Sequence, residues 1–215
     1  MGTYRHKETG KRFLLVHIPR TGGRFISVNL EQNGWEMEPI DYCGIPHYQH
    51  GVIDDCEIAH FYRELYEKHC EIEDIPQIAV IRNPVDRFIS ASTYFRTLYG
   101  PQVQQRMEDY DEFISIIENF HKDLDVETRN WWRPQIDYLT DETYVWKFED
   151  GFGDDFSAWI SNILGVDFSL KVNAPLSSID KAAKSRGRVE FSDEVVDYLK
   201  KFYHNDIKQF YPELI

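Results

Sequence analysis

The segment HIPRTGGRF, residues 17–25, combines residue types that can hold an anion. Arg20 and Arg24 flank the pair Gly22-Gly23. Guanidinium groups donate charge-assisted hydrogen bonds to phosphate-like groups, and glycine leaves room for such a group to approach the backbone. A Gly-Gly turn before a helix is by itself more often only a tight connection than a binding site. The two arginines favour the anion site.

A second candidate is the stretch VIRNPVDRFISAS, which runs from Val80 to Ser92. Arg82 ends a predicted strand, and Ser90 lies roughly 9 Å into the helix predicted after it. A guanidinium and a hydroxyl on the same side of this turn can share one phosphate. The alternative, a structural ion pair for Arg82 and a surface hydroxyl for Ser90, is equally compatible with this stretch taken alone.

The elements around these two turns alternate between strands and helices. Apolar runs predict strands over 13–18, 78–81 and 144–148, and helical spacing predicts helices over 22–32, 54–69 and 84–100, around Phe113 to Phe120, from Phe156 to Leu164 and from Ser192 onward. No linker or internal repeat interrupts the chain. We therefore expect one α/β domain over residues 1–215, with a mostly parallel central sheet flanked by helices. Ligands of such folds bind beyond the carboxyl ends of the strands, where both turns lie.

Composition narrows the classes of partner. With 24 Lys and Arg against 37 Asp and Glu, the net charge of −13 opposes binding to nucleic acid or to an anionic membrane. No apolar stretch is long enough to span a bilayer, and residues 1–12 lack the apolar core of a secretion signal. The three cysteines have no metal-ligand spacing. These features predict a cytoplasmic protein with no metal site.

The two turns together resemble the sulfotransferases that use 3′-phosphoadenosine 5′-phosphosulfate (PAPS), in particular the carbohydrate sulfotransferases. Further similarity lies in RNWWRPQIDYL, YVWKFED, KSRGR and the final FSDEVVDYLKKFYHNDIKQF, in the family's order. The resemblance implies a P-loop-like sulfotransferase fold with PAPS as sulfuryl donor and no metal. It implies that the donor is held by three groups of residues: the first turn on the 5′-phosphosulfate, the second on the 3′-phosphate, and the basic loop closing over the 3′-phosphate. These are Arg20, Thr21, Gly22, Gly23, Arg24 and Phe25; Arg82 and Ser90; and Arg186, Gly187 and Arg188.

Two residues depart from the family pattern. The loop lysine that assists the leaving group is Arg20 here, and the serine or threonine after the glycines is Arg24. Because arginine does not readily give up its proton, Arg20 is expected to act by fixed charge rather than as a general acid. Tyrosylprotein sulfotransferases resemble this chain in having arginine at that place.

The resemblance also guides the search for a catalytic base and an acceptor site. Histidine titrates in the range required to accept a hydroxyl proton. His50 is the first choice and His47 the second, whereas His17 is expected to be structural. Trp131, Trp132 and Arg133 lie where relatives build the acceptor groove, and we expect at least one of the two rings to be exposed.

The sequence thus predicts transfer of a sulfuryl group from PAPS to a hydroxyl on a glycan or a small hydroxylated metabolite. Its partners are a nucleotide donor and that acceptor, without nucleic acid or membrane. Two alternatives stay open: a non-catalytic binder of adenosine 3′,5′-bisphosphate and a nucleotide-dependent kinase.

Overall fold

The computed structural model describes residues 2–42, 45–47, 51–99, 114–115, 129–172, 181 and 187–215. The chain divides into two compact units, each built from two separate stretches of sequence. Unit 1 comprises Met1–Arg82 and Asp137–Ala174, and unit 2 comprises Asn83–Ile136 and Pro175–Ile215. The helix predicted around Phe113 to Phe120 falls mostly outside the described residues.

Unit 1 contains a five-stranded sheet in the order β3-β1-β2-β8-β9. Its strands are β1 (Gly2–His6), β2 (Arg12–Val16), β3 (Trp35–Met37), β8 (Gln77–Ile81) and β9 (Tyr144–Lys147). β2 pairs in parallel with β8, and β8 with β9, whereas β1 is antiparallel to both β2 and β3. The sheet is therefore mixed, which corrects the expectation of a mostly parallel one. The short connection between β1 and β2 permits only an antiparallel hairpin.

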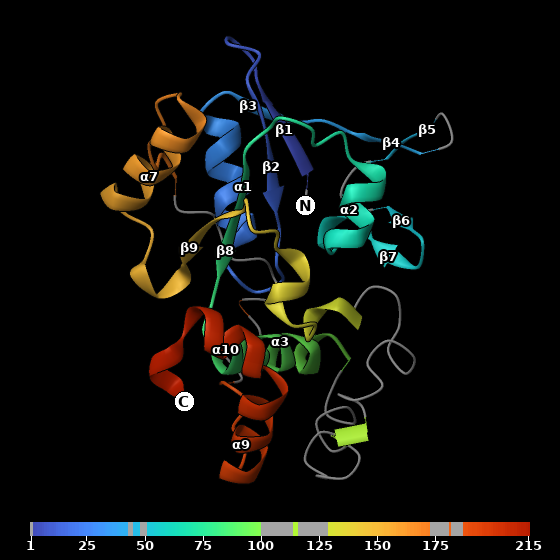
Figure 1. The fold of residues 1–215 in the computed structure, drawn as a ribbon, viewed down its shortest axis with the longest axis vertical. Coiled ribbons are helices and arrows are strands. Elements are labelled where there is room, and N and C mark those ends of the chain that lie inside the picture. The colour runs from blue at the N-terminus through green and yellow to red at the C-terminus, as the bar shows by residue number, and fades with distance from the viewer. Residues whose placement is uncertain are drawn as a thin grey trace. The chain divides into compact units, whose positions relative to one another are not determined.

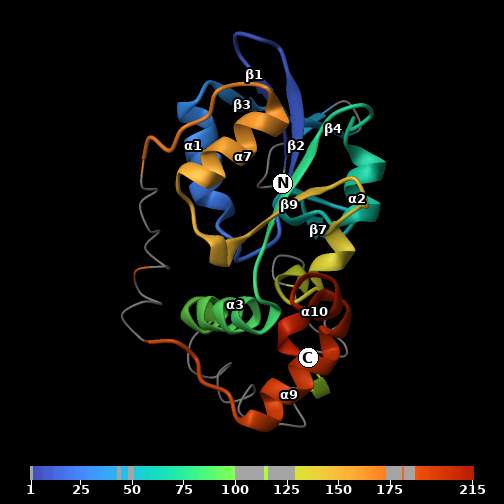
Figure 2. The ribbon, with the colours of Figure 1, turned by 60° about the vertical axis from the view of Figure 1, so that its left-hand side comes forward.

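Helices cover both faces of this sheet. In Figures 1 and 2, α1 (Gly23–Gln32) and α7 (Asp154–Leu164) lie on one side and α2 (Arg63–His69) on the other. α7 ends at Gly165, whose φ of 60° gives the left-handed C-cap that glycine adopts without strain. The core between the sheet, α1 and α7 contains Phe13, Leu15, Ile26, Leu30, Ile78, Val80, Phe156, Ile160 and Leu164. Since alternate residues of β2 enter this core while the rest are also buried, β2 is covered on both faces, as its apolar run predicts.

The segment predicted as one helix over 54–69 is helical only in its second half. β6 (Val52–Ile53) and β7 (Cys56–Glu57) form a small hairpin, followed by the 3-10 turn η1 (Ile58–His60). Asp54 and Asp55 form the hairpin turn with φ values of 49° and 55°, a conformation that aspartate tolerates better than most residues. A second two-stranded sheet pairs β4 (Ile40–Tyr42) with β5 (Ile45–His47). Between Lys147 and α7, the chain makes the 3-10 turn η4 (Phe148–Asp150).

Unit 2 is helical in its described part. It contains α3 (Pro84–Tyr99), η2 (Arg129–Trp131), α9 (Asp193–Phe202), α10 (His204–Phe210) and η5 (Pro212–Leu214), and η3 (Gln135–Tyr138) crosses the boundary between the units. Asn83 caps α3, because its Oδ1 accepts hydrogen bonds from the backbone N–H groups of Val85 (3.0 Å) and Asp86 (3.2 Å). Ser192 caps α9 in the same way. The apolar core holds Phe88, Ala91, Phe95, Trp131, Trp132, Val195, Leu199 and Tyr203.

Two buried charged side chains hold one segment of unit 2 in place. Arg87, fully buried on α3, donates to the carbonyl oxygens of Trp131 (2.9 Å) and Arg133 (2.5 Å). Asp206, fully buried on α10, accepts from the backbone N–H groups of Gln135 (2.8 Å) and Ile136 (2.9 Å). Burial raises the pKa of the Asp206 carboxyl, although these two hydrogen bonds and the charge of Arg87 act in the opposite direction. The segment from 131 to 136 is therefore fixed through its backbone from α3 and α10.

Candidate active site

The loop between β2 and α1 has the backbone of an anion-binding turn. Gly22, the N-cap of α1, has φ 93°, and Arg20 has φ 68°, which is unusual for a residue with a Cβ atom. No described side chain caps the start of α1. The first N–H groups of a helix carry partial positive charge, so an uncapped start after a glycine turn is suited to a phosphate-like group.

His17 supports this loop from within. A Cβ atom built on Gly23 would lie 2.0 Å from Nε2 of His17, so the imidazole packs directly against the backbone of Gly23. Burial lowers the pKa of His17 well below its ordinary value, and the nearby charge of Arg20 acts in the same direction. His17 is thus a neutral packing residue, in agreement with the structural role expected from sequence.

The remaining loop residues divide into inward and outward side chains. Thr21 is buried, and its hydroxyl donates to the carbonyl oxygen of Ile18 at 2.8 Å, so this side chain braces the loop itself. Arg24 is exposed on the first turn of α1, and Arg20 is half-buried. Phe25 packs on Phe152 with ring centroids 5.0 Å apart. Of the predicted donor-binding residues in this loop, Arg24 is exposed, Arg20, Gly22 and Phe25 are half-buried, and Thr21 and Gly23 are buried.

Arg82 is the residue that the structure brings to this loop. Strand β8 lies beside β2, and Arg82 follows its last residue. Its Nη1 donates to the carbonyl oxygen of Arg20 at 3.3 Å, and its guanidinium lies 4.6 Å from the centroid of the Phe148 ring. The backbone contact and the cation–π contact place a fixed positive charge at the carboxyl ends of β2 and β8.

Two aromatic residues beside the loop were not predicted. Phe148 and Phe152 follow β9, and a Cβ atom on Gly22 would approach their rings to 3.5 Å and 3.0 Å. Position 22 therefore favours glycine for two reasons: its backbone is left-handed, and an aromatic ring lies too close for a Cβ atom to fit easily. The signal in the sequence was the position of YVWKF, since parallel strands end at the same edge of the sheet. Lys147 pairs in register with Ile81 and so also ends its strand there.

A second residue that the sequence reasoning missed is His60. Its ring centroid lies 5.1 Å from that of His17, and its Nδ1 lies 2.8 Å from Oε2 of Glu57. Burial lowers the pKa of His60, whereas Glu57 partly restores it. A carboxylate beside Nδ1 favours the tautomer whose Nε2 accepts a proton. His60 therefore contacts His17, and His17 in turn packs against Gly23 in the loop. Both residues of the pair, Glu57 and His60, lie inside the helix that the sequence predicts over 54–69, so nothing in that prediction pointed to their contact.

In unit 2 the structure brings Ser90 and the end of the basic loop to one helix. Gly187 accepts a hydrogen bond from Nη2 of Arg96 at 2.6 Å, and the N–H of Val189 donates to Oγ1 of Thr93 at 3.0 Å. Between these anchors, Arg188 forms an ion pair with Asp86 on the first turn of α3. Residues four apart lie on one helix face, so Asp86 and Ser90 are neighbours. Arg186 falls outside the described residues.

The expected acceptor residues are in the core of unit 2. Trp131 is 8% exposed, Trp132 is fully buried and Arg133 is 8% exposed. The expectation of an exposed ring is wrong, because both indoles pack against Phe95 and their segment is held by Arg87. The polar residues around the pair in sequence bind backbone and buried groups instead of marking a surface. Neither histidine proposed as base is defined: His47 ends β5, where only the backbone is described, and His50 lies outside the described residues.

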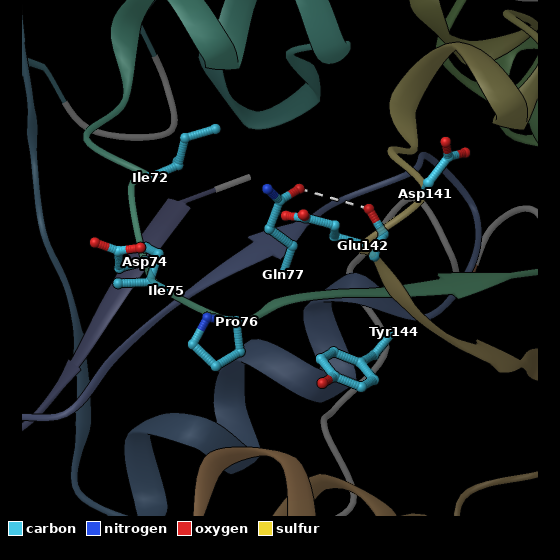
Figure 3. A pocket seen from close by; sticks show the side chains of 9 residues that line it. Ile72, Asp74, Ile75, Pro76, Gln77, Asp141, Glu142 and Tyr144 are labelled. Carbon is cyan, nitrogen blue, oxygen red and sulfur yellow. Dashed lines mark hydrogen bonds between the residues drawn. The ribbon is translucent and has the colours of Figure 1, made fainter.

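A separate cavity of about 570 Å³ opens at the amino ends of β8 and β9 in unit 1, at the opposite end of these strands from the loop (Figure 3). Three carboxylates, from Asp74, Asp141 and Glu142, line it together with Gln77 and Tyr144. This lining repels anions, so it does not match the charge of the loop site. Among the residues that the structure describes, no group of three or more His, Cys, Asp or Glu side chains is arranged to hold a metal ion. No helix within the described stretches combines the length and the apolar character needed to cross a membrane.

These observations define an α/β protein with an arginine-bearing glycine loop at the carboxyl ends of its parallel strands. The model of the sulfotransferase family matches residues 11–212, nearly the whole chain and both units, and the chain belongs to this family. Membership supports sulfuryl transfer as its general activity and makes it a transferase. Neither the curated proteins nor the solved structures give a significant match.

Proposed function

We propose that the chain transfers a sulfuryl group from PAPS to an acceptor hydroxyl. The observation that carries this proposal is the contact of Arg82 with the backbone of Arg20, at the uncapped start of α1. It gives the loop two guanidinium groups and helix N–H groups that no described side chain caps, in a chain with a net charge of −13. Such a concentration of positive charge suits a polyanionic nucleotide.

The residues divide the donor between them. Arg20 and the N–H groups of Gly22 and Gly23 hold the 5′-phosphosulfate, and Arg82 holds the 3′-phosphate. The roles of Ser90, Arg186, Gly187 and Arg188 at the 3′-phosphate rest on the family resemblance. Arg24 is exposed on the first turn of α1, Phe25 packs on Phe152, and Thr21 shapes the loop through its hydrogen bond to Ile18.

The chemistry is an in-line displacement at sulfur. The acceptor oxygen forms a bond to sulfur while the bond from sulfur to the phosphate oxygen breaks, and the hydroxyl proton passes to a base. Arg20 stabilises the charge on the departing oxygen by its fixed position. PAPS, when bound, supplies the activated sulfuryl group.

Three histidines are candidates for the base. His50 and His47 are proposed from the sequence, and His60 is proposed from its contacts. In favour of His60 are the carboxylate of Glu57 near Nδ1, the lowered pKa that keeps the ring neutral, and the contact of its ring with that of His17. A neutral imidazole with an oriented second nitrogen is the form that accepts a proton.

The acceptor is proposed to be neutral or sparsely charged. The net charge of −13 repels a highly sulfated chain unless basic residues line the acceptor groove. A glycan with few charges or a small hydroxylated metabolite meets this condition. Strong, salt-sensitive binding of a heparin-like polymer would contradict it.

The test compares two nucleotides that differ in the 3′-phosphate. Adenosine 3′,5′-bisphosphate should raise the melting temperature far more than AMP, since a ligand that binds only the native state stabilises it, and a tighter ligand at the same concentration does so more. Arg82→Ala should abolish the difference. Transfer of labelled sulfate from PAPS to a panel of hydroxylated acceptors then separates an enzyme from a binder. Equal shifts with both nucleotides would refute the donor, binding without transfer would favour the non-catalytic binder, and magnesium-dependent ATP turnover would favour a kinase.

A further inference from the structure

We propose that Asp86 sets the affinity of this protein for the donor's 3′-phosphate by competing with that phosphate for Arg188. The inference rests on the proposed function, because it concerns the same nucleotide. It assigns to Asp86 a role in tuning affinity, and the contacts from which it is argued, those of Asp86, Arg96 and Arg188, all lie within unit 2.

The competition follows from which groups share one face of α3. Asp86 and Ser90 are four residues apart, so their side chains project from adjacent turns of the same side. Nη2 of Arg188 is in contact with Oδ1 of Asp86. A phosphate at the Ser90 hydroxyl would therefore lie beside the guanidinium of Arg188 and beside the carboxylate of Asp86. The first attracts the phosphate and the second repels it.

Arg188 does not depend on Asp86 to reach this helix. The backbone on either side of it is anchored independently, since Arg96 binds the carbonyl of Gly187 and Thr93 binds the N–H of Val189. Val189 is buried, which adds an apolar contact to these two hydrogen bonds. Removing the carboxylate therefore releases the guanidinium without releasing the loop.

The ion pair has the strength expected of a contact that a phosphate can replace. The side chains of Arg188 and Asp86 are 54% and 41% exposed, so water and salt screen their attraction. A phosphate dianion carries more charge than a carboxylate and forms stronger hydrogen bonds with a guanidinium. Replacement of Asp86 by the phosphate at Arg188 is hence favourable. Two effects reduce the gain: the ion pair between Arg188 and Asp86 is lost, and the negative charge of Asp86 remains close to the phosphate.

The decisive experiment measures the affinity of the full chain for adenosine 3′,5′-bisphosphate and for AMP, by calorimetry at low and at physiological salt. Asp86→Asn should tighten binding of the bisphosphate roughly two- to fivefold and leave AMP unchanged. The gain should shrink as salt is raised. In an Arg188→Gln background, Asp86→Asn should have a much smaller effect, because the competition has been removed. Unchanged or weaker bisphosphate binding by Asp86→Asn would overturn the proposal.

Two controls make the result specific. Asp197→Asn removes the same charge from an exposed residue of α9 and should leave both affinities unchanged. A gain equal to that of Asp86→Asn would attribute the effect to net charge and overturn the inference. Thermal unfolding of each variant shows whether it is folded. A wild-type protein that does not distinguish the two nucleotides refutes the donor, and the inference with it; a wild-type preference that Asp86→Asn does not increase refutes the inference alone.

Discussion

The imidazole of His17 lies so close to the backbone of Gly23 that it leaves no room there for a Cβ atom. The last apolar strand residue before the loop is Val16, and α1 begins at Gly23, so the imidazole of His17 fills the space beneath the turn. The loop therefore presents its N–H groups on a packed support rather than on a flexible segment. That support is the kind of preorganisation on which electrostatic catalysis depends.

Gly23→Ala should destabilise the protein by about 1–3 kcal/mol, the usual cost of an extra methyl group forced into a packed site. It should also weaken binding of adenosine 3′,5′-bisphosphate, because the displaced ring distorts the loop. Denaturant unfolding and calorimetry measure the two effects. Gly153→Ala is the matched control, since nothing lies within 4 Å of a Cβ atom there. Adding His17→Ala to Gly23→Ala should restore part of the stability, and no recovery would show that the clash lies elsewhere.

Arg20 combines a charge with a left-handed backbone, so substitutions there separate activity from stability. Arg20→Ala should lower the single-turnover rate about a hundred- to thousandfold, the loss typical of one transition-state donor. Arg20→Lys should retain or improve activity, because it keeps the charge. Arg20→Gly should be as inactive as Arg20→Ala but more stable by about 1 kcal/mol, since glycine adopts a φ of 68° without strain. Wild-type turnover in Arg20→Ala would remove this residue from the mechanism.

His60 as the base predicts a particular pH profile for sulfuryl transfer. A base works when deprotonated, so the rate is constant above its pKa and falls as the pH decreases through it. Because burial lowers the pKa of His60, the acidic limb should lie below the ordinary histidine value of about 6.5. His60→Ala should cut single-turnover transfer about a hundred- to ten-thousandfold, remove this limb and leave affinity for the bisphosphate nearly intact.

The same measurements on His50→Ala and His47→Ala provide the comparison. Both variants should keep most of their activity if His60 is the base. Loss of transfer and of the acidic limb in His50→Ala, with an active His60→Ala, would return the role to the residue favoured by the sequence. Loss in His47→Ala alone would assign it to the second choice.

Asp206 should be the most sensitive position of unit 2. Asp206→Ala leaves two buried N–H groups without an acceptor and removes the carboxylate near Arg87, at a cost of about 3–5 kcal/mol. Asp206→Asn keeps an acceptor oxygen and should cost less. Denaturant unfolding measures both, with Asp197→Ala on exposed α9 as a control expected within about 0.5 kcal/mol of wild type. A loss below about 1 kcal/mol in Asp206→Ala would contradict the anchoring role.

The strand-turn-helix units could be predicted because their signals are local. An apolar run, a glycine turn and a helical stripe gave β2 and α1, and a proline at the first helical position gave α3. β1 was missed because polar residues such as Thr3 and Arg5 alternate with its apolar ones in only five residues, and its partners are chosen by the fold. Without β1, the antiparallel part of the sheet, formed by β3, β1 and β2, could not be predicted either.

The site divides in the same way. The glycines and arginines of the loop were found from spacing, but the role of His60 depends on contacts with Glu57 and His17 that only the folded chain creates. Trp131 and Trp132 were misplaced because a polar sequence neighbourhood says nothing of where those polar groups bind. Arg87 reaches the backbone of their segment from 44 residues away.

The interleaving of the two units along the chain sets the order in which the protein can be made. Unit 1 needs β9 and α7 from its second stretch, and unit 2 needs α9 and α10 from its own. A chain emerging from the ribosome can therefore complete its sheet only after the first half of unit 2 has already been synthesised. That half, with α3 and its buried Arg87, must then wait for Asp206 near the end of translation. No single continuous fragment contains either unit alone, so expression of one unit requires a gene that joins its two stretches through a linker or supplies them as two pieces.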